Sequence, residues 1–280
     1  MSALTVDLRT FDVGAEAASP QEFAAQVTRL VRESWESGAD IVCLPEYLWM
    51  GLERFTGETE ERPAMAAISR LFWTELWPDL QNELTCKDKA AILGTAPWAE
   101  GEGAPTNRAP IISNGVAHHQ EKRSLTPWES SFAAGLDTAI FELQGFRFAV
   151  LICFDIEVPE WSVALRGKGI DVLLVPSATE SVLGVERVGR CASARAVELG
   201  CYVGVCHLVG KTNSVLVDEN VGRLAWFTPS QSPFVEAPRE IVTPVVEKNF
   251  HWLRGVASAD LLRRMRALRA ETNPALLPAK

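Results

Sequence analysis

Basic runs, long apolar runs and a leader pattern are all missing from this sequence. Its 27 Lys and Arg residues are outnumbered by 36 Asp and Glu residues, giving a net charge of -9 over 280 residues. Nucleic acids and anionic membranes need clustered basic residues, so neither partner is expected. Apolar runs such as that at 148–153 are far too short to span a bilayer. Since a basic-then-apolar N-terminus is also lacking, we predict a cytoplasmic protein without a membrane segment.

Histidine is scarce, and the cysteines are not paired along the sequence. Only 4 His residues are present, HExxH is absent, and the 6 Cys residues include no CxxC pair. Zinc sites depend on such spacings, so no metal is expected. A chain of this length does not need disulfides to stabilise its core, and the cysteines are expected to be reduced. We predict no cofactor.

Against these absences stands a hydrophobic content of 47%, enough for a sizeable core. Strand and helix patterns alternate, which is typical of an α/β protein. Hairpins are expected at Asn114-Gly115 and Gln144-Gly145. Because no linker or repeat is visible, residues 1–280 are predicted to form one domain with a C-terminal arm at about 270–280. The expected strands lie at 3–9, 40–47, 90–98, 170–176 and 201–209, and the helices at about 19–38, 63–80, 185–200 and 259–269.

Three polar residues stand where predicted strands end: Glu46, Lys122 and Cys153. Taken singly, each has a plain explanation, since a strand-end Glu or Lys is often solvated and a lone Cys is often a small core residue. Amide hydrolysis by a thiol needs a base for the Sγ proton, an acid for the departing nitrogen, and positive charge or donors for the oxyanion. A carboxylate, a lysine and a cysteine together supply all of these.

The motifs around these residues resemble those of the nitrilase superfamily of carbon-nitrogen hydrolases, whose members use a Glu-Lys-Cys triad in this chain order. Each motif is weak alone, but their joint order is specific. The resemblance implies a four-layer αββα sandwich, catalysis without a cofactor, and assembly into homodimers or higher homo-oligomers. The motifs are "PEY" at 45–47, "NRAPIISNGVAHHQEKRSLTPWE" at 107–129, "CFDIEVPE" at 153–160, "VLLVPSATE" at 172–180 and "CASARAVELGCYVGVCHLVG" at 191–210.

The triad chemistry assigns a role to each residue. Glu46 would accept the thiol proton, pass it to the leaving nitrogen and then activate water. Lys122 would stabilise the tetrahedral intermediate and favour a thiolate at Cys153. The backbone N–H of Phe154 is the expected second oxyanion donor. By resemblance, Glu129 is a fourth member that positions Lys122 and the substrate nitrogen.

Residues next to these motifs are candidates for the pocket wall. Tyr47, Trp49 and Trp128 flank the triad motifs, although aromatics beside strand ends are as often part of the core. Asp155, Glu157 and Glu160 precede or open a helix near Pro159, where acidic side chains are favourable, so structural roles are expected for them. Farther along, Arg195 and Glu198 are three apart on a helix and are expected to pair beneath the site.

Two competing interpretations are weaker. A Cys-His hydrolase would pair Cys153 with His118, His119 or His207. The first two point to opposite faces of one strand, so one at most faces the site, and His207 is better explained as a satisfied, partly buried histidine. The "GKT" at 210–212 does not match a phosphate loop, because Gly204 leaves five residues before Gly210 where four are required. No nucleotide site is predicted.

Two residues near the cysteine bear on the substrate. By resemblance, Asp155 stands where true nitrilases usually carry Glu, which favours an amide over a nitrile. At Glu157 many omega-amidase-like members carry Arg; an Arg there would meet a substrate carboxylate, whereas Glu157 would meet an amine. We therefore predict hydrolysis of a small primary amide by water, and we add the hypothesis that this amide bears an amine. An N-carbamoyl amidohydrolase and a catalytically silent binding scaffold are the alternatives.

Overall fold

Two β-sheets form the centre of the protein. The computed structural model describes residues 3–101 and 103–269. The first sheet has the order β15-β1-β3-β4-β6-β5, with β7 paired to β6, and comprises β1 (Ala3–Arg9), β3 (Ile41–Leu44), β4 (Ala90–Leu93), β5 (Ala96–Trp98), β6 (Thr106–Ser113), β7 (Val116–Glu121) and β15 (Trp252–Ser258). The second has the order β14-β13-β11-β10-β9-β8, with β2 and β12 paired to β11, and comprises β2 (Phe11–Asp12), β8 (Ile140–Leu143), β9 (Phe146–Val150), β10 (Val172–Ser177), β11 (Tyr202–Lys211), β12 (Glu219–Asn220), β13 (Ala225–Phe227) and β14 (Glu240–Val242).

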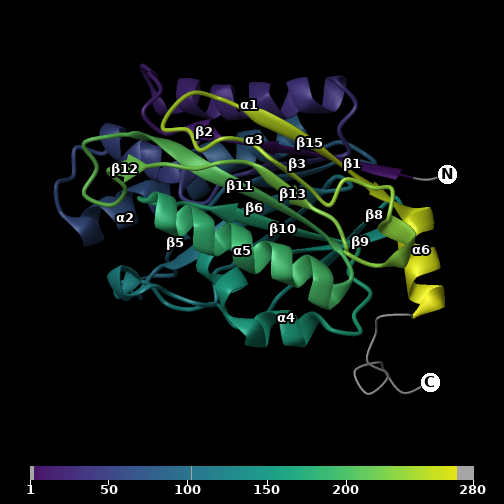
Figure 1. The fold of residues 1–280 in the computed structure, drawn as a ribbon. Coiled ribbons are helices and arrows are strands. Elements are labelled where there is room, and N and C mark those ends of the chain that lie inside the picture. Colours follow the sequence, from purple (N-terminus) through teal and green to yellow (C-terminus); the bar gives the residue numbers. More distant parts are fainter. Residues whose placement is uncertain (1–2, 102, 270–280) are drawn as a thin grey trace.

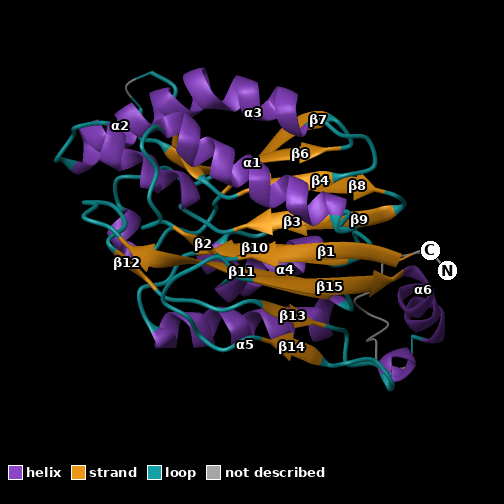
Figure 2. Ribbon diagram, turned by 90° about the horizontal axis from the view of Figure 1, so that it is seen from above, coloured by secondary structure: helices purple, strands orange, loops and turns teal. Residues whose placement is uncertain are grey.

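Helices cover both outer faces of this pair of sheets. One set, α1 (Pro20–Glu36), α2 (Glu61–Arg70) and α3 (Trp77–Leu84), lies over the first sheet, and the other, α4 (Pro159–Leu165) and α5 (Val182–Leu199), lies over the second (Figure 1). The view in Figure 2 looks down on α1 and α3 crossing above the strands. The last helix, α6 (Ala259–Leu268), packs at one end of the sandwich. The predicted four-layer αββα architecture is confirmed.

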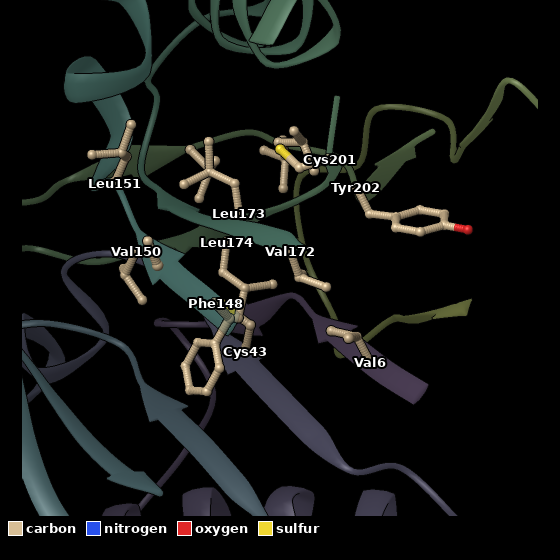
Figure 3. Close-up of a cluster of buried hydrophobic side chains, with 14 of the residues drawn as sticks. Val6, Cys43, Phe148, Val150, Leu151, Val172, Leu173, Leu174, Cys201 and Tyr202 are labelled. Atoms are coloured by element: carbon tan, nitrogen blue, oxygen red, sulfur yellow. The ribbon is translucent and has the colours of Figure 1, made fainter. Parts of the chain in front are cut away.

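The largest core cluster lies between the two sheets. Figure 3 shows Val6 and Cys43 of the first sheet across from Phe148, Val172 and Leu174 of the second. All of these side chains are fully buried. Since burying one such side chain stabilises the fold by about 1.5–3 kcal/mol, this layer is a main source of stability. A second core cluster fills the space between the first sheet and its covering helices.

Local sequence signals explain most elements. The Ser19 hydroxyl caps α1 by accepting a hydrogen bond from the Glu22 N–H, and Pro20 occupies the first helical turn. The predicted hairpins form β6–β7 and β8–β9, with Asn114-Gly115 and Gln144-Gly145 both at positive φ as such tight turns require. The helix expected at about 63–80 extends farther, from Glu61 to Leu84, because a π-helical turn at 71–76 joins α2 to α3.

Two expectations concern the C-terminal end of the chain. The last helix lies where it was predicted, whereas the expected arm at about 270–280 falls outside the described residues. Within residues 3–101 and 103–269, no helix has both the length and the apolar character that crossing a membrane requires.

The strand directions bring the candidate residues to one edge. Strands β1, β3 and β4 run parallel in the first sheet, as do β9, β10 and β11 in the second. Glu46 follows β3, Cys153 follows β9, and Ala178 directly follows β10. A hydrogen bond of 3.0 Å from the Ala178 N–H to Glu46 Oε2 shows that the carboxyl ends of the two sheets meet.

Gly94 keeps the Glu46 segment in place. Its φ is +73°, and a Cβ there would lie 2.6 Å from the Pro45 carbonyl oxygen and 2.7 Å from the Leu48 Cβ. We expect Gly94→Ala to lower the free energy of unfolding by about 2–4 kcal/mol, because left-handed strain adds to overpacking. Gly145→Ala is the control: φ there is +82° with no atom within 4 Å, so only the strain remains. Urea unfolding of both variants measures the difference, and equal losses would contradict this account of Gly94.

Candidate active site

Lys122 lies between two buried carboxylates. Its Nζ donates to Glu46 Oε1 at 2.8 Å and to Glu129 Oε1 and Oε2 at 2.7 and 2.9 Å. The exposed fractions are 1% for Lys122, 1% for Glu46 and 0% for Glu129. Bulk water therefore screens these charges little, and the three side chains form one coupled unit.

Cys153 occupies a strained backbone position beside this unit. It follows β9 and begins the 3-10 turn Cys153–Glu157 with φ at +46°, a left-handed conformation that non-glycine residues rarely adopt. Its Sγ lies 3.5 Å from the Ala178 carbonyl oxygen and interacts with the Glu46 carboxylate. Among the described residues, none accepts a hydrogen bond from the Phe154 N–H, the next in the turn. The turn therefore presents a thiol and an N–H donor together.

Glu46 has two further partners that the sequence did not indicate. Asn107 Nδ2 donates to Glu46 Oε1 at 2.9 Å, and the Ala178 N–H donates to Oε2. Asn107 lay within a recognised motif but carried no separate signal, and a backbone N–H leaves none in a sequence. Together with Lys122, these donors fix both carboxylate oxygens of Glu46.

Glu129 is held by its own short helix and by Tyr47. The turn Pro127–Glu129 carries a capping box in which the Thr126 N–H and hydroxyl donate to Glu129 Oε2 at 2.7 and 2.8 Å. The Tyr47 hydroxyl donates to Glu129 Oε1. Burial raises the pKa of Tyr47 well above its usual value, so this phenol stays a donor at neutral pH. The Glu129 carboxylate is therefore fixed against Lys122.

The charges of the unit determine its protonation. Burial is the largest influence on Glu46 and, with the Glu129 charge, outweighs the opposing effect of Lys122, raising the pKa of Glu46 to about 7. The carboxylates overcome the effect of burial on Lys122, whose pKa is raised, so the ammonium stays charged. Burial and the Glu46 charge raise the pKa of the Cys153 thiol well above its usual value, and Lys122 offsets this only in part.

The expectation that Lys122 favours a thiolate at Cys153 holds in direction only: Lys122 lowers the pKa of the thiol, but burial and the Glu46 charge raise it by more. Lys122 is shared with two carboxylates, and its charge offsets the effects of burial and Glu46 on the sulfur only in part. The thiol rests in its protonated form and needs a base during attack. Glu46 is the carboxylate whose charge acts on the thiol, and its Oε2 accepts the N–H of Ala178, the residue whose carbonyl oxygen lies 3.5 Å from Cys153 Sγ.

Cys153 opens into a cavity of about 340 Å³ and is itself 7% exposed. All four residues predicted to contact substrate, Tyr47, Trp128, Phe154 and Glu157, line this cavity. Trp49 does not. Its indole N–H donates to the Leu93 carbonyl oxygen within the core, and its buried ring packs against Phe23 and Phe72.

Glu157 shares its carboxylate with an arginine, which the sequence-based argument did not include. Its carboxylate accepts a hydrogen bond from Arg187 Nε on α5 at 3.2 Å. By contrast, the expected pair of Arg195 Nη1 with Glu198 is present at 2.9 Å, and Arg195 Nε also donates to the Ile156 carbonyl oxygen beneath the turn. Glu157 thus lines the cavity as one half of an ion pair.

The histidines and the "GKT" segment lie apart from the thiol. His207 is buried, with Nδ1 at 2.7 Å from the Arg223 carbonyl oxygen, and burial lowers its pKa to about 4. His118 packs edge-on against Phe141. The segment at 210–212 ends β11, and Lys211 pairs with Glu219. In the part of the chain that the structure describes, no three His, Cys, Asp or Glu side chains are grouped to hold a metal ion.

Curated relatives of this chain include several hydrolases. Probable hydrolase YhcX of Bacillus subtilis is 29% identical over 253 residues, covering 88% of this chain and 48% of that protein. The (R)-stereoselective amidase of a Pseudomonas species is 32% identical over 170 residues, covering 60% of each chain. The matched region thus spans about half of the first relative's length.

Solved structures share the fold at low identity. XC1258 from Xanthomonas campestris, described as a CN-hydrolase superfamily protein, aligns with a TM-score of 0.73 at 20% identity, covering 100% of this chain and 98% of that one. Nit3 of Saccharomyces cerevisiae aligns with a TM-score of 0.69 at 18% identity, covering 98% and 96%.

The family model for carbon-nitrogen hydrolases matches residues 10–231. This range includes both carboxylates, the lysine and the thiol described above. Because the match covers well over half of its length, the chain belongs to the carbon-nitrogen hydrolase family, as the resemblance to the nitrilase superfamily predicted.

Proposed function

We propose that the protein is an amidase that hydrolyses a small primary amide to a carboxylic acid and ammonia through a thioester on Cys153. One observation carries this proposal: Lys122 Nζ contacts Glu46 at 2.8 Å and Glu129 at 2.7 Å, with the Cys153 thiol beside Glu46. The arrangement supplies a base and a fixed positive charge next to a nucleophile that lines the cavity.

In the acylation half, Cys153 Sγ attacks the amide carbonyl carbon while Glu46 accepts the thiol proton. The C–S bond forms, and the carbonyl electron pair moves to oxygen. Lys122 and the Phe154 N–H stabilise this oxyanion, since both lie beside the thiol. Glu46 then gives its proton to the nitrogen, the C–N bond breaks, and ammonia leaves.

In the deacylation half, water attacks the thioester carbonyl and Glu46 accepts its proton. The second tetrahedral intermediate collapses with cleavage of the C–S bond, and the proton returns from Glu46 to the Cys153 sulfur. Because Asn107 and the Ala178 N–H hold the Glu46 carboxylate, it needs no movement between the halves.

The relatives support an amide as the substrate. Omega-amidase YafV of Escherichia coli is 24% identical over 180 residues, and the (R)-stereoselective amidase is a further amidase among them. A mutant of the amidase from a Nesterenkonia species, which shares the fold, is described in complex with butyramide. A cavity of about 340 Å³ accommodates a small molecule of this size.

The charge of the cavity predicts which amides bind best. It is lined by Glu157, Glu180, Asp218 and Glu219, against the single cation Arg187. Arg187 is paired with Glu157, and Glu219 with Lys211, while Glu180 and Asp218 form no ion pair among the described residues. We expect kcat/KM for 4-aminobutanamide to exceed that for succinamate by about tenfold or more, with a ratio that falls as salt is added. Asp218→Asn should lower the ratio of kcat/KM for 4-aminobutanamide to that for succinamate. A higher kcat/KM for succinamate in the wild type would contradict this reasoning.

The test of the proposal is ammonia release from primary amides, N-carbamoyl amino acids and simple nitriles, run with wild type and Cys153→Ala. Release from primary amides by the wild type alone is the expected result. Release from N-carbamoyl compounds alone would replace the amidase by the alternative hydrolase. Absence of any turnover would favour the binding scaffold.

A further inference from the structure

Asp155 is a buried carboxylate outside the set that the proposed mechanism uses. It is 0% exposed. Its Oδ1 accepts hydrogen bonds from the backbone N–H groups of Ser124 at 2.6 Å and Arg123 at 3.1 Å, and its Oδ2 accepts one from the Ile152 N–H at 3.1 Å. The sequence suggested a structural role at the helix that begins near Pro159; Asp155 instead accepts the N–H of the N-cap residue of the 3-10 turn Cys153–Glu157, and two N–H groups that follow Lys122.

These donors flank the two groups that must meet at the substrate carbonyl. Arg123 and Ser124 directly follow Lys122, and Ile152 directly precedes Cys153. One side-chain carboxylate therefore ties the backbone of the lysine segment to the backbone of the cysteine turn. Oδ1 serves the lysine segment alone, whereas Oδ2 accepts the Ile152 N–H and, at 3.4 Å, also the Arg123 N–H. A further tie, from Trp161 Nε1 to the Ser124 hydroxyl at 2.6 Å, connects the lysine segment to α4 rather than to the turn itself.

Burying a neutral side chain at this point would cost less free energy than burying a carboxylate. Asp155 forms no ion pair with any described residue. The charge of Lys122 acts on it from a distance and lowers its pKa. Burial raises the pKa of Asp155 to about 6, although its three N–H donors and Lys122 all lower it. An acceptor with two charged oxygens is what this junction needs, because both of its sides present only donors.

We propose that Asp155 is a positioning residue, which sets the distance and direction between the Lys122 ammonium and the Cys153 thiol. The inference rests on the proposed function, since it concerns how Lys122 reaches an oxyanion formed at Cys153. A displacement of about 1 Å in such an arrangement costs roughly 10²-fold in rate. In Asp155→Asn, one carboxylate oxygen becomes an NH₂ group that faces an N–H donor, so one side of the junction is lost.

Asp155→Asn and a control, Asp171→Asn, test this role. Asp171 is also a buried aspartate that accepts a backbone N–H, from Arg147 at 2.7 Å, and pairs with Arg266, but it lies at the opposite end of β10 from Ala178. We expect kcat per titrated Cys153 thiol to fall by about tenfold to 10²-fold in Asp155→Asn, with KM changed less than about threefold. Asp171→Asn should lower the melting temperature and leave kcat unchanged.

An unchanged kcat per thiol in Asp155→Asn, or an equal fall in both variants, would overturn the proposal. Asp155→Glu keeps two charged oxygens, so its kcat should lie closer to wild type; a kcat no higher than that of the Asn variant would also count against it. If the wild type turns over no amide, the proposed function fails on its own. The rate of Cys153 alkylation by iodoacetamide then decides: slowing in Asp155→Asn but not in Asp171→Asn supports positioning, and equal rates overturn it.

Discussion

Glu46→Gln is expected to lower kcat for amide hydrolysis by a factor of about 10²–10⁴ while the protein stays folded. The amide has nearly the shape of the carboxylate but cannot accept the proton of Cys153 or of the attacking water. The loss should be large, because the raised pKa of Cys153 leaves little thiolate to attack without a base. Steady-state kinetics on the best amide of the substrate panel measure it.

The pH profile tests the same residue in the wild type. Burial raises the pKa of Glu46 to about 7, and only the deprotonated form accepts the thiol proton. We therefore expect kcat/KM to rise with pH through about 7 and to fall tenfold per pH unit well below it.

Glu53→Gln is a matched control for this acid limb. Glu53 is also a buried carboxylate, 7% exposed, which accepts the Val215 N–H at 2.9 Å away from Lys122. The pH at which kcat/KM reaches half of its maximum should be close to that of the wild type in this variant. A wild-type profile that stays flat down to pH 5 would show that Glu46 is not the base.

The order of strands and helices was predictable because the hydrophobic pattern fixes it locally. Asn114-Gly115 and Gln144-Gly145 mark hairpins through their backbone conformations, and Ser19 with Pro20 marks the start of α1. The helix that continues to Leu84 was underestimated, since the π turn between α2 and α3 leaves no pattern that periodicity detects.

The candidate site was predictable where side chains follow strands and carry chemistry. Glu46, Lys122 and Cys153 met both conditions, and the structure brings them together. Contacts made through the tertiary fold were not predictable. The Ala178 N–H has no side-chain signature, and Arg187 reaches Glu157 from a helix far along the chain.

The protonation of the thiol illustrates the same difference. In the sequence, one lysine and one cysteine suggest a lowered thiol pKa. In the fold, the burial of Cys153 and the charge of Glu46 outweigh the lysine, so the thiol pKa is raised instead. Net charge and depth, rather than residue type, decide how a buried group titrates.

Lys122→Met is expected to lower the free energy of unfolding by about 3–5 kcal/mol, because it leaves two buried carboxylates without their cation. Both carboxylates are at most 1% exposed, and the raised pKa of Lys122 means that its stabilising charge is fully present at neutral pH. The surface pair of Arg190 with Glu186, in which Arg190 is 81% exposed, is the control. Arg190→Met should cost less than about 1 kcal/mol in the same urea unfolding measurement.

The stability of Lys122→Met should also depend on pH in a defined direction. Without the cation, the folded-state pKa of Glu46, which burial already raises to about 7, rises further above its unfolded value of about 4.3. The folded state then binds more protons than the unfolded chain, so relative to wild type the variant should gain stability as pH falls from 8 to 5. A difference from wild type that does not change with pH would argue against unpaired charge as the cause.

Removing the charges together separates the stability of the site from its chemistry. The triple variant Lys122→Met, Glu46→Gln, Glu129→Gln keeps the volumes close to native and buries no ion, so it should regain most of the stability lost in Lys122→Met. It should remain inactive, because it has neither a base nor a cation. If the triple variant unfolds as readily as the single one, the loss comes from the packing of the lysine side chain. If the triple variant regains the stability, the loss in Lys122→Met comes from unpaired buried charge, and the fold accepts the burial of these ions because catalysis needs them.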